Sequence, residues 1–150
     1  MWTDDDRRWM SQALAEARRA ADEGEVPIGA VVVCGGRIIG RGHNMTEQLQ
    51  DVTAHAEMIA ITAAAQSLGG KYLPEATLYV TVEPCCMCAG AIGWSQIRRI
   101  VYGADDIKRG YTSVTHDHKT PFHPKAIVQS GLMSDESVAL MRTFFSRRRC

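Results

Sequence analysis

Apolar residues between positions 4 and 24 recur at the spacing of an amphipathic helix, at Trp9, Met10, Ala13, Leu14 and Ala17. Three aspartates occupy the first turn of this segment, where carboxylates stabilise the positive end of the helix dipole. Gly24 follows the last turn, as a terminating residue does. The pattern therefore predicts an opening helix over residues 4–24.

The following segments alternate in the way that is typical of strands. Two β-branched runs, at residues 31–33 and 38–39, flank the pair Gly35-Gly36 and predict a hairpin within residues 27–44. Residues 76–84 alternate and stop at a proline, while residues 97–104 and 126–131 predict two further strands. Strand-like segments therefore occur in both halves of the chain.

Further helices are expected between and after these strands. An alanine-rich segment over residues 53–70 has Thr53 as its expected cap and a glycine pair at its end. A short helix over residues 85–96 and a capped amphipathic helix over residues 134–150 are separated by an aperiodic loop over residues 111–125. Helices that alternate with strands predict one α/β domain, residues 1–150, with chemistry at the carboxyl ends of its strands.

Composition narrows the class of protein. The chain has 150 residues, of which 45% are hydrophobic, enough for one compact core. Its 17 basic and 17 acidic residues balance, so any binding of nucleic acid depends on a local patch. The absence of a leader-like or membrane-length apolar run favours a cytoplasmic protein without a membrane partner. An odd number of cysteines, five, then favours metal or catalytic use over a disulfide framework.

Three of the cysteines lie in the stretch EPCCMC, residues 83–88. In a helix, Cys85 and Cys88 share one face, whereas Cys86 points away. Pro84 fits a helix start, where the positive end of the dipole favours thiolates over thiols. The spacing of the pair by itself is compatible with a redox switch, a structural zinc site or a catalytic zinc site.

The stretch TAHAEM, residues 53–58, supplies a second set of candidates. His55 and Glu57 are about 200° apart around a regular helix, so they converge only at an entry turn with extended backbone. A catalytic zinc ion has three protein ligands and a water whose pKa it lowers to about 7, and a nearby carboxylate moves the proton. The combination of His-x-Glu with Pro-Cys-x-x-Cys is the known signature of zinc-dependent nucleobase deaminases.

With these motifs, the sequence resembles the bacterial tRNA-specific adenosine deaminases of the zinc-dependent cytidine and deoxycytidylate deaminase superfamily. The resemblance runs along nearly the whole chain, through EVPIGAVVV, GHN, TAHAEM, ATLYVTVEPCCMCAGAI, RIVYGADD and FFSRRR. It implies a three-layer α/β/α fold of the cytidine-deaminase type with a five-stranded mixed central sheet. It also implies a homodimer, one zinc ion per chain, and hydrolytic conversion of the wobble adenosine in the anticodon stem-loop of an arginine tRNA to inosine.

The resemblance also implies individual roles. The zinc ligands are expected to be His55, Cys85 and Cys88, with Glu57 as the catalytic proton shuttle. The expected substrate contacts are Asn44 and the backbone of Ala54 to the flipped base, Val26, Pro27 and Ile28 in the pocket wall, and Asp106 and Lys108 to the neighbouring ribose and phosphate. The family has small residues after the glycine that corresponds to Gly110, whereas this chain has Tyr111 and a His-rich loop over residues 115–124, which is expected to approach the anticodon or a partner subunit.

Two other functions stay open at this stage. The same zinc chemistry serves enzymes that deaminate a free nucleobase or nucleoside, with guanine and then cytosine as the alternative substrates. The second alternative is an RNA-binding module that zinc stabilises and that has no enzymatic activity. Such a module has no need of Glu57. The stretch DDIKR at residues 105–109 favours RNA. The arginines at 147–149 fit two roles equally well, contact with RNA phosphates and stabilisation of the carboxyl end of a helix.

Overall fold

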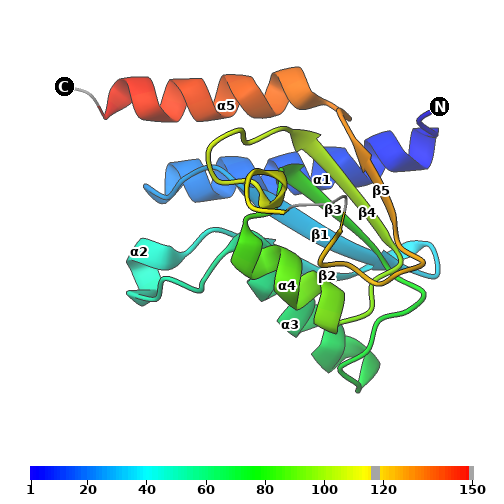
Figure 1. Ribbon diagram of the computed structural model, residues 1–150. Coiled ribbons are helices and arrows are strands. Elements are labelled where there is room, and N and C mark those ends of the chain that lie inside the picture. The colour runs from blue at the N-terminus through cyan, green and yellow to red at the C-terminus, as the bar shows by residue number, and fades with distance from the viewer. Residues whose placement is uncertain (116–118, 149–150) are drawn as a thin grey trace.

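The computed structural model describes residues 1–115 and 119–148, and its centre is a five-stranded mixed sheet with the order β2-β1-β3-β4-β5 (Figure 1). The strands are β1 (Gly29–Cys34), β2 (Arg37–His43), β3 (Thr77–Val82), β4 (Arg99–Ala104) and β5 (Ile127–Ser130). Strand β1 pairs antiparallel with β2 and β3, whereas β4 is parallel to both of its neighbours. The expected five-stranded mixed sheet is therefore confirmed.

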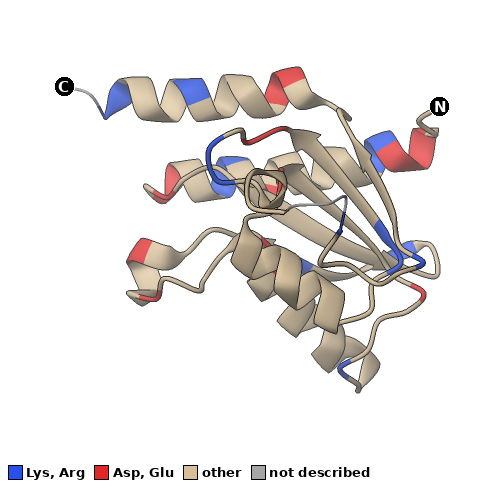
Figure 2. Ribbon diagram, in the orientation of Figure 1, with Lys and Arg blue, Asp and Glu red and all other residues tan. Residues whose placement is uncertain are grey.

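Helices cover both faces of this sheet and complete the three layers. One face carries α1 (Asp4–Asp22) and α5 (Ser134–Arg147), and the other carries α3 (Ala56–Leu68) and α4 (Cys86–Trp94) (Figure 1). Helices α3 and α4 contain one charged residue, Glu57. These two helices are therefore drawn almost entirely in tan in Figure 2. Among residues 1–115 and 119–148, no helix combines the length and the apolarity that crossing a bilayer requires.

Alternate residues of the central strands face two separate apolar layers. One set packs with α1 and α5, and it includes Val31, Val33, Tyr79 and Val101. The other set packs with α3 and α4, and it includes Ala30, Val32, Leu78, Val80 and Ile100. Because both faces are covered, the central strands are rich in apolar residues. The β-branched run at residues 31–33 and the alternation over residues 76–84 made two of them visible in the sequence.

Small residues set the distance between α3 and β2. A Cβ atom at Gly40 would lie 2.3 Å from the carbonyl oxygen of Ala60, and one at Gly42 would lie 2.3 Å from the carbonyl oxygen of Ala56. The alanines of α3 on this side are buried. Since only glycine allows this approach, the β2–α3 contact fixes the height of the first turn of α3 above the sheet.

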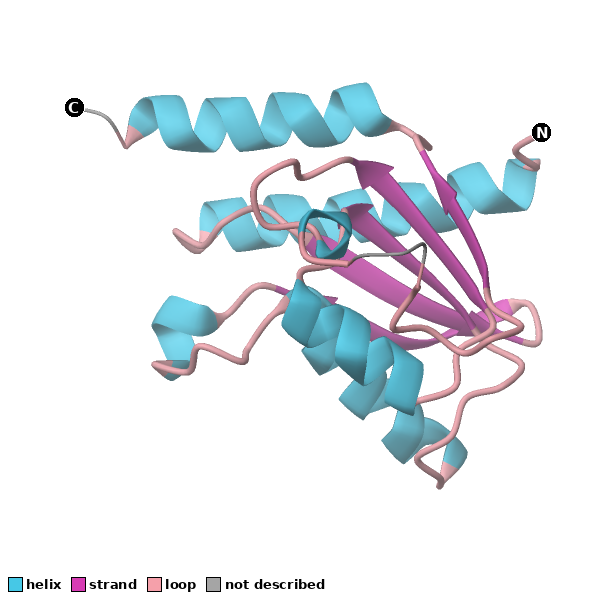
Figure 3. Ribbon diagram, in the orientation of Figure 1, coloured by secondary structure: helices cyan, strands magenta, loops and turns pink. Residues whose placement is uncertain are grey.

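The connections at one end of the sheet contain two short elements that no periodicity in the sequence predicted, α2 (Thr46–Leu49) and the 3-10 turn η1 (Tyr111–Ser113) (Figure 3). Neither is long enough to show a helical repeat. The turn η1 lies within the loop expected over residues 111–125, of which residues 116–118 fall outside the described residues.

Three expected helix starts are wrong in detail. Helix α3 begins at Ala56 with His55 as N-cap, and Thr53 instead donates its N–H and hydroxyl to Asp51 at 2.8 and 2.7 Å. Helix α4 has Cys85 as N-cap, so Pro84 lies before the helix. Helix α5 has no side-chain cap, because its N-cap is Met133 in the left-handed conformation.

Candidate functional site

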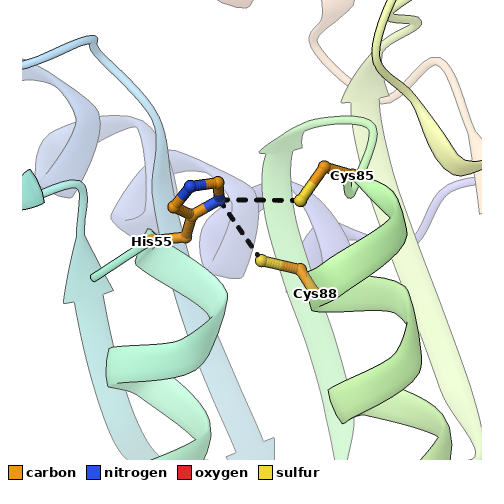
Figure 4. Close-up of side chains that lie close together, drawn as sticks. All are labelled: His55, Cys85 and Cys88. Atoms are coloured by element: carbon orange, nitrogen blue, oxygen red, sulfur yellow. Dashed lines mark hydrogen bonds between the residues drawn. The ribbon is translucent and has the colours of Figure 1, made fainter. Parts of the chain in front are cut away.

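The side chains of His55, Cys85 and Cys88 meet between the first turns of α3 and α4 (Figure 4). The Nδ1 atom of His55 lies 3.6 Å from Sγ of Cys85 and 3.5 Å from Sγ of Cys88. His55 and Cys85 are the N-cap residues of their helices, and both have extended backbone. Extended backbone at the entry turn is what lets each side chain leave its helix toward the other.

The geometry of these three atoms fits a zinc ion. With Zn–N about 2.1 Å and Zn–S about 2.3 Å, tetrahedral ligands place nitrogen and sulfur about 3.6 Å apart. The two observed separations, 3.6 and 3.5 Å, match this value. One imidazole and two thiols are also the donor types that zinc prefers, and the cluster leaves a fourth tetrahedral position open. Cys86 is exposed and does not belong to the cluster.

The short contacts within the cluster shift the pKa of each of its members. The hydrogen bond from Cys88, and then that from His55, hold the pKa of Cys85 at about 4. The same hydrogen bond to Cys85, together with burial, raises the pKa of Cys88 well above its usual range. The hydrogen bond with Cys85 raises the pKa of His55. The two sulfur atoms lie within 4.8 Å of each other, and a divalent cation between them stabilises both as thiolates.

A cavity of about 380 Å³ opens beside the cluster, and Glu57 is part of its wall. Glu57 follows His55 by two positions in the first turn of α3, and its side chain is buried. Burial raises the pKa of Glu57 to about 7. A carboxyl group in this state both accepts and donates a proton near neutral pH, as a general acid–base requires.

The predicted substrate contacts divide into two groups. Val26, Ile28, Asn44 and Asp106 line the same cavity as His55, Glu57 and Cys85. Pro27, Ala54 and Lys108 are not among the lining residues: Pro27 and Ala54 are buried, and Lys108 is exposed. The backbone of Ala54 is engaged within the chain, since its N–H donates to Asp51 and its carbonyl accepts from Met45.

Several residues that line the cavity were not predicted from the sequence, namely Thr46, Ala56, Glu83, Arg109, Met141 and Phe145. Glu83 directly precedes the Pro-Cys motif, and this position could have drawn attention to it. Phe145 is 43% exposed and lines the cavity. It reaches the site from α5, so no local motif connects it with the cysteines.

A charged network supports the segment that carries Asn44. His43 at the end of β2 places Nδ1 2.9 Å from Glu16 and Nε2 2.9 Å from Glu23. Glu23 also accepts from the side chain of Gln48 at 2.7 Å. Carboxylates on both sides of the imidazole fix the ring, and the residue that follows it is Asn44.

The arginines near the carboxyl end have contacts of their own. Arg148 donates to the carbonyl of Gly24 at 2.8 Å and lies over the ring of Phe144, 4.2 Å from its centroid. Arg149 lies outside the described residues. Arg148 therefore helps to attach the end of α5 to the end of α1.

Comparison with known proteins gives a consistent result. The model of the MafB19-like deaminase family matches residues 4–149. A tRNA-specific adenosine deaminase of Agrobacterium fabrum is 48% identical over 143 residues, which cover 94% of this chain and 94% of that protein.

Solved structures agree with this match. A structure of a tRNA:A34 deaminase, described for A-to-I editing at the wobble position of transfer RNA, is 46% identical with a TM-score of 0.80, covering 89% of this chain and 98% of that chain. A guanine deaminase of Bacillus subtilis is 28% identical with a TM-score of 0.66, covering 95% of this chain and 93% of that chain. The guanine deaminase is more distant in both identity and TM-score.

Proposed function

The chain belongs to the family of the tRNA-specific adenosine deaminases; its reaction is the deamination of adenosine in tRNA, and we propose that its target is the wobble adenosine of an arginine tRNA. The reaction consumes one water and releases one ammonia as adenosine becomes inosine. The observation that carries the proposal is the convergence of His55, Cys85, Cys88 and the buried Glu57 on one cavity. We place the activity in the cytoplasm, where cysteines stay reduced and serve as metal ligands.

The residues of the cluster fit one zinc ion per chain, held by His55, Cys85 and Cys88. When bound, zinc activates a water molecule for hydrolysis by lowering its pKa to about 7. Glu57 is the group that moves protons in our proposal, because its carboxyl lines the cavity beside two of the ligands and is shielded from bulk solvent. It takes a proton from the water and delivers one to the leaving amine.

Asn44 is the residue that we assign to the adenine base. Its Oδ1 accepts from the N–H of Thr46 at 3.3 Å, so the amide is held in place while it lines the cavity. An oriented carboxamide recognises the edge of a flipped base through paired donor and acceptor groups. Val26 and Ile28 supply apolar wall to the same cavity.

Incubation of the protein with bulk bacterial tRNA, followed by sequencing of inosine, tests the proposal, with Glu57→Gln as the matched control. Inosine confined to the wobble position of an arginine tRNA, and absent with Glu57→Gln, is the expected result. Inosine at other positions would reject the arginine-tRNA assignment. Ammonia release from free guanine or cytosine, without inosine in tRNA, would show that the substrate is a free nucleobase and not tRNA.

We also propose that the chain forms a homodimer through the outer side of α4. Trp94 is 84% exposed on this helix, and Met87 and the open Gly90 lie on the same uncharged element. A large exposed aromatic residue on an uncharged helix is typical of a protein interface.

Sedimentation velocity of the wild type and of Trp94→Glu tests this dimer, with Trp2→Glu as a control on the other face of the sheet. A dimer that dissociates only with Trp94→Glu is expected. A monomeric wild type, or a dimer that Trp94→Glu leaves intact, would reject the proposed interface.

A further inference from the structure

The carboxylate of Glu83 is buried at the end of β3 and has no part in the proposed chemistry, yet both of its oxygens are engaged. Oε1 accepts from the N–H of Asp106 at 3.1 Å. Oε2 accepts from the N–H and the hydroxyl of Thr112, at 3.1 and 2.7 Å. One buried side chain therefore fastens both ends of the segment of residues 105–112, which runs from the end of β4 into η1 and which we call the rim loop.

The backbone of the rim loop is also tied to the start of α4. The N–H of Tyr111 donates to the carbonyl of Pro84 at 2.8 Å, and Gly110 forms a bridge with Cys85. A Cβ atom at Gly110 would lie 2.0 Å from Oε2 of Glu83, so only glycine fits there. The loop thus has a defined position relative to the metal cluster.

Inside the rim loop, the side chain of Asp106 fixes the turn. Its Oδ1 accepts from the N–H groups of Lys108 and Arg109, at 3.2 and 3.1 Å. This turn brings Arg109 into the cavity wall, whereas Lys108 is not among the lining residues. Figure 2 shows the acidic and basic residues next to one another along this connection.

The charge of the cavity wall makes Arg109 distinctive. Three of the lining residues are acidic, Glu57, Glu83 and Asp106, and Arg109 is the one lysine or arginine among the described lining residues. Within the described part of the chain, Arg109 forms no ion pair with a carboxylate. A polyanion that approaches an acidic cavity gains most from a cation placed at its mouth.

We propose that Arg109 binds a backbone phosphate next to the flipped adenosine, and that Glu83 is the positioning residue that holds the rim loop so that Arg109 reaches it. This inference rests on the proposed function, because it takes an RNA strand as the ligand. A guanidinium presents two parallel donors to a phosphate, which suits it to this role better than the exposed ammonium of Lys108.

Binding of an anticodon stem-loop RNA of the arginine tRNA, measured by fluorescence anisotropy in the Glu57→Gln background, tests the role of Arg109. We expect Arg109→Ala to raise Kd roughly fivefold to tenfold and to reduce the slope of log K against log salt by about 0.7. The matched control is Arg37→Ala, which removes the same charge at the start of β2 and is expected to leave Kd within twofold.

A second RNA, with neutral methylphosphonates at the two phosphates that flank the target adenosine, identifies the partner. It is expected to bind as weakly as the unmodified RNA binds Arg109→Ala, and Arg109→Ala should then cause no further loss. Equal effects of Arg109→Ala and Arg37→Ala on the unmodified RNA would overturn the assignment of Arg109 alone. Failure of the parent protein to bind the stem-loop would reject the proposed function together with this inference.

The role of Glu83 is tested by Glu83→Gln and by the milder Thr112→Val, which removes only the hydroxyl donor. Both variants are expected to reduce the slope of log K against log salt as Arg109→Ala does. When Arg109→Ala is added to either variant, Kd should rise by a smaller factor than it does in the parent protein. A purely structural role would weaken folding without changing the salt slope. Full additivity with Arg109→Ala would overturn the positioning role of Glu83.

Discussion

The Nδ1 atom of His55 lies 3.6 Å from the Sγ atom of Cys85, although the two residues are separated by 30 positions in the chain. Each residue is the N-cap of its own helix, so the contact joins two helix starts. Cys88, one turn into α4, adds the second sulfur at 3.5 Å. This arrangement makes the metal content of the protein sensitive to single substitutions.

The zinc content of the protein is expected to depend on His55, Cys85 and Cys88, and not on Cys86, which lies in the same motif. Cys85→Ala, Cys88→Ala and His55→Ala should each lose the zinc ion, because three protein ligands leave no spare donor. Cys86→Ala is the matched control and should retain about one zinc per chain. Elemental analysis of the purified variants measures this, and zinc retained in Cys88→Ala would contradict the assignment.

Glu57→Gln should keep both fold and metal but lose turnover. The substitution preserves the shape of the side chain and removes its ability to carry a proton, so kcat is expected to fall by about 10²–10⁴. Inosine formation in single-turnover assays, together with zinc analysis, measures the two properties separately. Substantial activity in Glu57→Gln would show that another group moves the proton.

His43 is expected to act on the substrate site through Asn44. His43→Gln breaks the paired contacts with Glu16 and Glu23, which should cost about 1–2 kcal/mol of stability and raise KM for RNA. Arg41→Gln is the control: Arg41 contacts Glu16 from the surface at 3.7 Å, so its loss should cost less than about 0.5 kcal/mol. Urea unfolding and steady-state kinetics distinguish the variants, and identical KM values would disprove the link.

Gly42→Ala should displace the first turn of α3. The added methyl group would lie 2.3 Å from the carbonyl oxygen of Ala56, so α3 and β2 have to separate at about 1–3 kcal/mol. Because this turn carries His55, the affinity for zinc should fall as well. Gly70→Ala, where no atom lies within 4 Å, is the control. Thermal unfolding and competition with a zinc chelator provide the two readouts.

Asp6 is expected to contribute stability that disappears in acid. Arg99 donates to Asp6 at 2.7 and 3.1 Å, and this contact, with the hydroxyl of Tyr79, holds the pKa of Asp6 well below its usual range. A depressed native pKa stabilises the fold above the unfolded value of about 3.9, and the contribution is lost as pH falls below it.

The variant Asp6→Asn tests this dependence. Because Arg99 is partly exposed, Asp6→Asn should lower the free energy of unfolding by about 2 kcal/mol at pH 7. This difference from the wild type should shrink toward pH 3. Asp5→Asn, whose pair with Arg8 is exposed at 3.4 Å, should change little at any pH. Urea unfolding at pH 7, 5 and 3 measures both, and a constant difference for Asp6→Asn would contradict the prediction.

The amino-acid sequence was sufficient to predict the main helices and strands and the three members of the His55, Cys85 and Cys88 cluster. Strands β1 and β3 were recognisable from the β-branched run at residues 31–33 and from the alternation over residues 76–84, which are local properties. The members of the cluster were recognisable because each lies within a short motif whose spacing is a local property.

Which of several neighbouring side chains reaches the site depends on long-range contacts that the sequence pattern does not show. Thr53 was expected to cap α3, yet the N-cap position belongs to His55, whose side chain makes no capping hydrogen bond and turns to the cysteines instead. Arg109, which the sequence did not single out, lines the cavity because Glu83 holds the rim loop from 23 and 29 residues away, whereas the expected contact of Lys108 with the substrate stays a prediction. In a loop, adjacent side chains point in different directions, and long-range hydrogen bonds that no local pattern encodes select which of them faces the cavity.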